Sequence, residues 1–353
     1  MNKHRPNLPR RQFLRLAAVG ALASVFPPAR GEAPITVVAS FSILGDVVRQ
    51  IGGERVAVTT LIGADEDAHA YQGKPSDAQA VARAQLLVAN GLGFDDWFGR
   101  LAHASGGQAP LLIASDGIAP RNAPEYAAHE HEHDHEHEHD HDEHDHDEHD
   151  HEHDHDEHEH DHDEHAHHGH GHDHGGLDPH AWQNPLNVKR YAANIAAALS
   201  KLDPQGRATY EANLAQYQQA LDALDRDYHA FFDALPADAR TLITAHDAFS
   251  YLADAYGLKL LAPVGAAGES QPSAATVAAI IGQIRAQNVR AVFLESGIDP
   301  RLMQQIAKES GARVGEPLFS DALSAENGAA PTYLHMMRHN LNTFRAALAP
   351  ANP

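Results

Sequence analysis

Three histidines stand where side chains from different strands can meet around a metal ion. His246 ends the apolar segment 241–245, His69 comes a few residues after another apolar segment, and His180 follows Asp-Pro in a third loop. Taken singly, each of them also fits a turn or a capping role. In open α/β sheets, however, ligands bind beyond the carboxyl ends of the strands, so loops that follow different strands converge in one crevice. The shared placement therefore predicts an imidazole site, which suits zinc and other transition metals.

Two carboxylates share the placement of these histidines. Glu295 closes one apolar segment and Asp321 follows another, and carboxylate oxygens are common ligands of zinc beside imidazole. A further pair, His335 and His339, is spaced by one helical turn near the C-terminus. No acidic residue stands next to that pair in the sequence, so a surface position is the simpler interpretation.

A tract of another kind interrupts the chain between residues 129 and 174. Of its 46 residues, 22 are His and 21 are Asp or Glu. It offers no side chain for a core, and ordering its backbone would cost about 1–2 kcal/mol per residue. We expect a disordered surface loop that gathers or senses transition metals through several weak imidazole sites. A solvated spacer or a pH-responsive segment is the alternative. The auxiliary ligands expected from the start of the tract are His129, His131, His133, His135, His137, His139, His141 and His144.

Outside this tract the chain is nearly neutral. The formal charge is −23, from 26 Lys and Arg against 49 Asp and Glu, but 21 of those carboxylates lie in the tract and the other 28 nearly balance the basic residues. No basic face is left for nucleic acid. The chain has no Cys, which excludes disulfides, thiolate metal sites, iron–sulfur clusters and a lipid-modified N-terminal Cys. Any metal must therefore be held by nitrogen and oxygen.

Residues 1–33 have the pattern of an export signal. A basic start precedes an apolar run at residues 16–26, and small and breaker residues follow it. The run is shorter than the ~20 residues that span a bilayer. Segment 10–15 is similar to the twin-arginine export motif, and a general secretory signal is the alternative. Either route predicts a soluble periplasmic protein whose signal peptide is cleaved.

The elements that must position the histidines form a repeating pattern. Short apolar runs alternate with segments of helical spacing, which predicts an α/β protein of two βα-repeat lobes with mainly parallel sheets. Expected strands cover residues 35–41, 56–62, 85–90, 111–115, 241–246, 259–264, 289–295 and 313–319. Expected helices include residues 76–83, 251–256, 274–286 and 301–310.

The middle of the chain lacks any strand pattern. Residues 187–202 and 205–235 are Ala-rich, with apolar residues at steps of three and four, and the second of these helices is long enough to connect two lobes. We therefore expect the following division: an export signal at 1–33, a first lobe at 34–203 that contains the tract, a linking helix at 204–236 and a second lobe at 237–353.

At these residues the chain resembles the periplasmic metal-binding subunits of ABC-type zinc and manganese importers, and more closely the zinc branch. The matching stretches run in family order over nearly all of the chain after the signal. They are His69-Ala70-Tyr71, Pro75-Ser76-Asp77, Asn90-Gly91, Asp96-Trp97, Asp178-Pro179-His180-Ala181-Trp182, Thr244-Ala245-His246-Asp247-Ala248-Phe249, Phe293-Leu294-Glu295 and Phe319-Ser320-Asp321-Ala322-Leu323-Ser324. A loop rich in His and acidic residues before the second metal ligand is also common among the zinc members of this family.

The resemblance implies two α/β lobes joined by a long backbone helix, with one metal ion in the cleft between them. It implies that His69, His180 and His246 are imidazole ligands and that Asp321 is the fourth ligand. Three imidazoles and one oxygen form a tetrahedral shell that Zn²⁺ accepts. In manganese members the place of His246 looks like a carboxylate, so a His there favours zinc. Glu295 would accept a hydrogen bond from a ligand imidazole and fix its tautomer.

One departure from the family pattern concerns the fourth ligand. The residues before His69 lack the usual Asp-Pro and read Glu66, Asp67 and Ala68 instead. Glu66, Asp67 or a water molecule is therefore an alternative to Asp321 at the fourth position.

The function implied by the resemblance is high-affinity zinc capture outside the cytoplasm. A monomeric protein would hold Zn²⁺ at one tight site and deliver it to a membrane permease driven by a cytoplasmic ATPase, without enzymatic chemistry. The alternatives are a carrier of manganese or another divalent metal, a metal buffer without a transporter, and a secreted zinc hydrolase. A hydrolase would need an open coordination position, and the HExxH pattern occurs only inside the low-complexity tract.

Overall fold

The computed structural model describes residues 33–68, 71–123, 176–265 and 272–349. The residues from Pro34 onward form one compact unit. The predicted export signal and the tract at 129–174 lie outside the described residues, as does His69. None of the helices in the described ranges combines the length and hydropathy that a bilayer-spanning segment needs.

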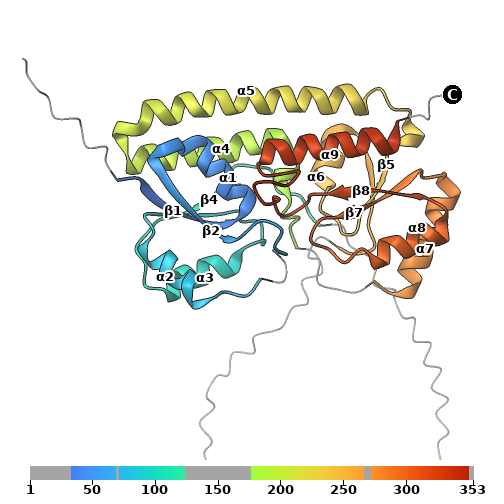
Figure 1. Cartoon of the computed structure of the whole chain (residues 1–353), viewed down its shortest axis with the longest axis horizontal. Coiled ribbons are helices and arrows are strands. Elements are labelled where there is room, and N and C mark those ends of the chain that lie inside the picture. The colour runs from blue at the N-terminus through green and yellow to red at the C-terminus, as the bar shows by residue number, and fades with distance from the viewer. Residues whose placement is uncertain (1–32, 69–70, 124–175, 266–271, 350–353) are drawn as a thin grey trace, which may run out of the picture. The chain divides into compact units, whose positions relative to one another are not determined.

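The first lobe is a four-stranded parallel sheet with helices on both faces (Figure 1). The strands are ordered β2-β1-β3-β4. In chain order its elements are β1 (Ile35–Phe41), α1 (Ser42–Gly52), β2 (Val56–Ile62), α2 (Pro75–Arg83), β3 (Leu86–Ala89), α3 (Asp96–Ala104) and β4 (Leu111–Ile113). All four strands run in one direction, so their carboxyl ends and the loops that follow them share one edge of the sheet.

The strands of this lobe send alternate side chains into two cores. Val37 and Phe41 of β1 belong to the core formed with α1 and with two later helices at residues 185–202 and 207–232, whereas Val38 packs with Val81 of α2 and Phe98 of α3. Neighbouring side chains along a strand point to opposite faces, and a sheet covered on both faces has mostly apolar strands. This is why the first expected strand, 35–41, has almost no polar alternation in its sequence.

Two helices in the middle of the chain connect the halves. They are α4 (Pro185–Leu202) and α5 (Arg207–Phe232). Helix α5 has 26 residues, which corresponds to about 39 Å at 1.5 Å per residue. It contacts α1 and α4 of the first lobe as well as α6 (Ser250–Tyr256) and α9 (Tyr333–Leu348) of the second (Figure 1). It is shorter than the expected helix at 205–235, because Pro204–Gly206 forms a 3-10 turn before it.

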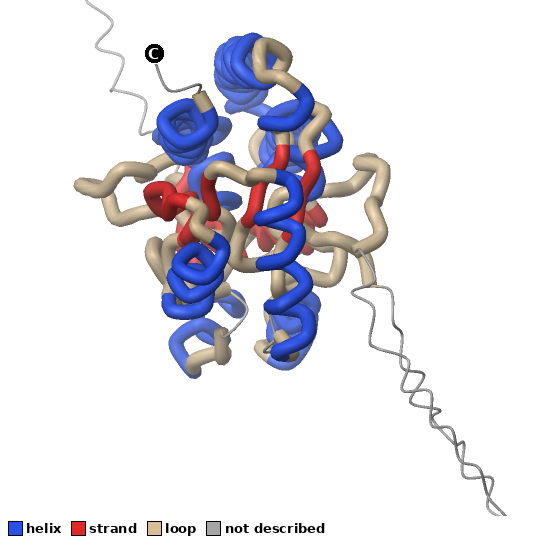
Figure 2. The backbone as a smooth tube through the Cα atoms, turned by 90° about the vertical axis from the view of Figure 1, so that its right-hand side faces the viewer, coloured by secondary structure: helices blue, strands red, loops and turns tan. Residues whose placement is uncertain are grey.

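The second lobe repeats the βα pattern with shorter strands, which pair in parallel as β5 with β6 and β7 with β8. Its elements are β5 (Thr241–Ile243), α6 (Ser250–Tyr256), β6 (Lys259–Leu261), α7 (Ala274–Gln287), β7 (Ala291–Glu295), α8 (Arg301–Ser310), β8 (Arg313–Leu318) and α9 (Tyr333–Leu348). Val292 of β7 packs toward α7 and α8, and the ring of Phe293 lies 5.3 Å from that of Phe344 on α9. Figure 2 shows the strands of the molecule between layers of helices.

The expected strands 241–246 and 259–264 are shorter in the structure for a specific reason. The backbone N–H groups of Ala245 and His246 donate to the Glu295 carboxylate, at 2.7 and 3.0 Å, instead of joining the sheet ladder. Beyond this point the two segments are joined only by an isolated parallel bridge between His246 and Val264. The strand thus ends where its backbone begins to build the site described below.

Candidate metal centre

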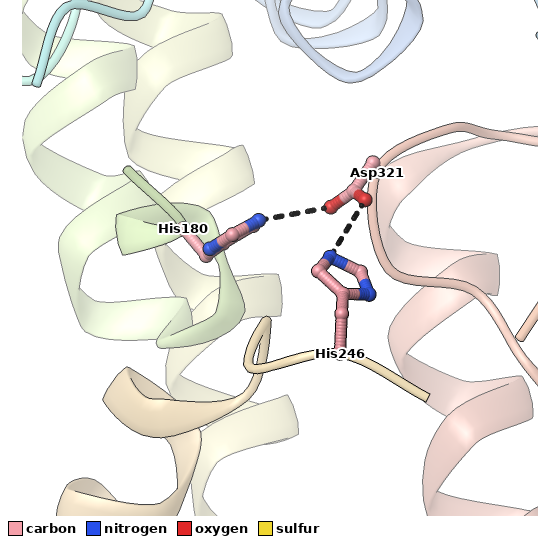
Figure 3. A group of neighbouring side chains, drawn as sticks. All are labelled: His180, His246 and Asp321. Carbon is pink, nitrogen blue, oxygen red and sulfur yellow. Dashed lines mark ion pairs between the residues drawn. The ribbon is translucent and has the colours of Figure 1, made fainter. Parts of the chain in front are cut away.

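His180, His246 and Asp321 come together although they are far apart in the sequence (Figure 3). Asp321 Oδ1 lies 3.4 Å from His180 Nε2, and Asp321 Oδ2 lies 3.1 Å from His246 Nε2. One ligand atom from each residue lies within 4.8 Å of the others. The three residues are buried, with exposed fractions of 0%, 2% and 8%. Among the described residues, this is the one group of at least three such side chains close enough to hold a metal ion.

Each of the three residues stands at the end of a regular element. His180 comes directly before the short 3-10 helix η2 (Ala181–Gln183), which leads into α4. His246 follows β5, and Asp321 lies in the loop after β8. The first residue belongs to the first lobe and the other two belong to the second, so the group lies where the lobes meet. The structure brings these three predicted residues together, although the described segment before His180 forms an isolated bridge at Leu177 and not a strand.

Asp178 fixes the orientation of His180. Its Oδ1 accepts a hydrogen bond from the His180 backbone N–H at 3.0 Å and lies 2.9 Å from Nδ1 of the ring. A carboxylate at Nδ1 favours the tautomer with hydrogen on Nδ1, which places the Nε2 lone pair toward Asp321. Asp178 is fully buried, and its Oδ2 lies 3.7 Å from Nε of Arg121, which balances its charge. This role of Asp178 was not predicted from the sequence.

Glu295 holds His246 in a corresponding way. Its Oε2 lies 2.9 Å from Nδ1 of the His246 ring, while Oε1 accepts the two backbone N–H groups described above. Burial disfavours the charged imidazole, but the Glu295 and Asp321 carboxylates outweigh this effect and hold the pKa of His246 well above its usual value of 6.5. A cation that enters between the ligands would take the place of that proton.

Aromatic rings line the first-lobe side of the group. The Trp182 ring centroid lies 5.2 Å from that of His180, and the Phe94 ring lies 6.4 Å from it. The two imidazoles themselves are 5.3 Å apart. Apolar surroundings lower the local dielectric constant, so the attraction between carboxylates and a cation is stronger here than in water. The arrangement is therefore suited to tight binding of a small cation.

The other candidates from the sequence are either exposed or lie outside the described residues. Glu66 is exposed, and its Oε2 accepts a hydrogen bond from the Gly63 N–H at 2.6 Å. Asp67 is exposed as well. His69 lies outside the described residues, between the buried Ala68 and the half-buried Tyr71, and the tract histidines from His129 to His144 also lie outside them.

The histidines near the C-terminus contact different partners. His335 Nδ1 lies 2.7 Å from the Thr332 hydroxyl, which caps α9, and His339 Nε2 lies 3.0 Å from the Pro317 carbonyl. Each ring therefore has a structural contact of its own, in accord with the surface interpretation of this pair.

A model of the family described as zinc-uptake complex component A (ZnuA), periplasmic, matches residues 37–347. The chain belongs to the ZnuA family. The manganese-binding lipoprotein MntA of Halalkalibacterium halodurans is 28% identical over 315 residues, which cover 89% of each protein. The iron-binding protein YfeA of Yersinia pestis is 29% identical over 334 residues, which cover 94% of this chain and 92% of YfeA.

Solved structures agree with this assignment. A manganese-bound mutant of the periplasmic metal binding protein from Candidatus Liberibacter asiaticus superposes with a TM-score of 0.69 at 26% identity, over 89% of this chain and 99% of that one. The periplasmic zinc binding protein TroA from Treponema pallidum has the same fold, with a TM-score of 0.71 at 24% identity over 90% of this ZnuA-family chain and 100% of TroA. The predicted two-lobe α/β fold with parallel sheets is confirmed.

The comparisons also decide between classes of function. Members of the ZnuA family are metal-binding solute-binding proteins of ABC transporters, not enzymes. The alternative of a secreted hydrolase is therefore excluded. At the level that the relatives share, the chain binds a divalent metal for an importer that consists of a permease and an ATPase.

Proposed function

We propose that this ZnuA-family protein captures Zn²⁺ in the periplasm and delivers it to the permease of an ABC importer. The observation that carries the proposal is the buried meeting of His180, His246 and Asp321, in which each imidazole has its Nδ1 on a carboxylate and its Nε2 toward Asp321. This leaves two imidazole lone pairs and a carboxylate aimed at one point. Nitrogen-rich sites favour zinc, whereas manganese sites prefer more oxygen ligands.

The proposed ligand set is His69, His180, His246 and Asp321. The described part contributes two nitrogens and one oxygen, and His69 would complete a tetrahedral shell as the third imidazole. A closed shell of protein ligands suits capture, because catalysis would require an open position. Because relatives of this chain are named for manganese and iron, competition between zinc and another divalent metal is the direct test of the metal choice.

The proposed export route begins with the signal at residues 1–33, which would be cleaved and leave a periplasmic protein. In the periplasm, the tract at 129–174 would gather metal weakly. The described residues on either side of the undescribed segment are joined by an antiparallel bridge between Asn122 and Leu177, and Leu177 is followed by Asp178, the partner of His180.

Metal analysis with competitive titration of zinc and manganese tests this two-tier proposal. The three forms to compare are the intact protein, a deletion of residues 129–174, and the triple variant His69→Ala, His180→Ala, His246→Ala. We expect one tightly bound zinc that only the triple variant loses, and several weaker ions that only the deletion loses. Loss of the tight ion on deletion of the tract would contradict the division, and tighter binding of manganese than of zinc would contradict the metal assignment.

The role of Glu295 gives a separate prediction. Glu295→Gln keeps the size of the side chain but removes the charge that holds the His246 ring, so zinc affinity should fall by about 10–100-fold, as is usual for a partner that orients a ligand. Chelator competition measures this change. The control is Glu316→Gln on the exposed part of β8, which should leave the affinity unchanged. Equal affinities of the two variants would show that Glu295 serves the backbone alone.

A further inference from the structure

The loop that carries Asp321 belongs to the second lobe by sequence but is hydrogen-bonded to the first. It runs from the end of β8 to the start of α9. Its first residue, Phe319, is still held within the second lobe, because its backbone N–H and carbonyl both bond to the Asn340 side chain, at 3.0 and 2.8 Å. From Ser320 onward backbone groups of the loop are hydrogen-bonded to the first lobe, while the Asp321 side chain still faces His246 of the second. Asp321 therefore directly follows Ser320, the first residue of the loop that is hydrogen-bonded to the first lobe.

The carbonyl of Ser320 receives two hydrogen bonds from the first lobe. Trp182 Nε1 and Gln183 Nε2 each donate to it at 2.8 Å. Both donors are fully buried and come from η2, the turn that directly follows His180. The two donors engage both lone pairs of one carbonyl, which fixes the direction of the peptide unit that leads into Asp321. One short turn thus supplies the ligand candidate of the first lobe and the donors that hold the ligand candidate of the second.

Further along, the same loop stays attached to the first lobe. The Leu323 backbone N–H donates to Ser42 Oγ at 3.0 Å, and its carbonyl accepts from the Asp65 N–H at 2.9 Å. The Asp65 carboxylate in turn accepts from the Ala325 N–H at 3.1 Å. Asp65 has a φ of 57°, a left-handed conformation that non-glycine residues adopt only where the surroundings hold them. At the end of the loop, Asp46 Oδ2 accepts from the Tyr333 N–H at 2.8 Å.

We propose that Gln183 is a positioning residue for the metal site, which sets the affinity and the release rate of the metal by holding Asp321 at a fixed distance from His180. The inference rests on the proposed role of Asp321 as a ligand. Gln183 acts through the Ser320 carbonyl and is not itself a member of the metal-ligand group.

The test uses Gln183→Met in the full-length protein. Methionine has a similar length and neither donates nor carries a strong acceptor. The exchange is mild for folding, because the Ser320 carbonyl keeps its bond from Trp182 and no buried acceptor is orphaned. We expect zinc to bind about 10-fold more weakly and a chelator to remove it correspondingly faster. In an Asp321→Ala background, the same exchange should have no further effect on zinc affinity.

A control separates positioning from general loosening of the structure. Tyr228→Phe removes another buried hydrogen bond, from α5 to the Met337 carbonyl on α9, and should lower the melting temperature of the metal-free protein without changing zinc affinity. If Gln183→Met fails to fold, Gln183→Asn withdraws the same amide by one methylene and should shift affinity in the same direction. Unchanged affinity in Gln183→Met, or an equal loss in the Asp321→Ala background, would overturn the inference. Undiminished binding by Asp321→Ala itself would instead overturn the ligand assignment.

Discussion

Replacing His246 by Ala is expected to remove most of the rise in melting temperature that zinc produces in this protein. With free zinc about 100-fold above Kd, binding should stabilise the folded state by about 2.7 kcal/mol, which corresponds to a rise of roughly 5–10 °C for a domain of a few hundred residues. Loss of a residue that only orients a ligand costs about 10–100-fold in affinity, so loss of a ligand should cost more. A Kd raised 100-fold would leave only about 0.4 kcal/mol at the same zinc concentration.

The matched control for this variant is His229→Ala. His229 lies on α5 and also has a carboxylate neighbour, with Nδ1 3.3 Å from Asp233 Oδ2, but it is exposed and outside the site. Thermal unfolding of both variants with and without zinc measures the two shifts. The control should keep the full rise of the unmodified protein. A full zinc-dependent rise in His246→Ala would refute its assignment as a ligand.

The repeating fold could be predicted from the sequence because it depends on local patterns. Apolar runs and helical spacing located the strands to within a few residues. The strand ends near His246 were wrong by three residues because Glu295, about 50 positions away, takes the backbone N–H groups that would extend the ladder. No local pattern contains such a contact.

Some residues of the site could likewise be predicted from the sequence, and others could not. His180, His246 and Asp321 were recognisable from their shared place after strands and from the family motifs around them. Asp178 and Gln183 were not, because a buried carboxylate or amide in a turn has the same sequence signature whether it caps a helix or holds a ligand. Their roles depend on which atoms they reach, namely the His180 ring and the Ser320 carbonyl. Positions set by contacts between lobes become visible only in the folded structure.

Trp182→Ala is expected to cause the largest loss of stability at a single position, about 3–5 kcal/mol, as for other buried aromatic residues that are replaced by Ala. Trp182 is fully buried, and its ring lies 4.9 Å from both Phe41 and Phe94. The exchange leaves a cavity at the junction of the lobes and also removes the indole bond to the Ser320 carbonyl. Denaturant unfolding of the protein in a chelator measures the loss without a contribution from metal.

Replacement of Trp97, the other tryptophan of the chain, is the control for this prediction. Trp97 is half-buried on α3 and packs against Tyr71, so Trp97→Ala should cost clearly less stability. Trp182→Phe should recover most of the apolar packing but not the bond to Ser320. If the indole bond helps to place Asp321, Trp182→Phe will be nearly as stable as the unmodified protein yet bind zinc more weakly. If the ring only fills space, Phe will restore stability and affinity together, and positioning of Asp321 would then rest on Gln183 alone.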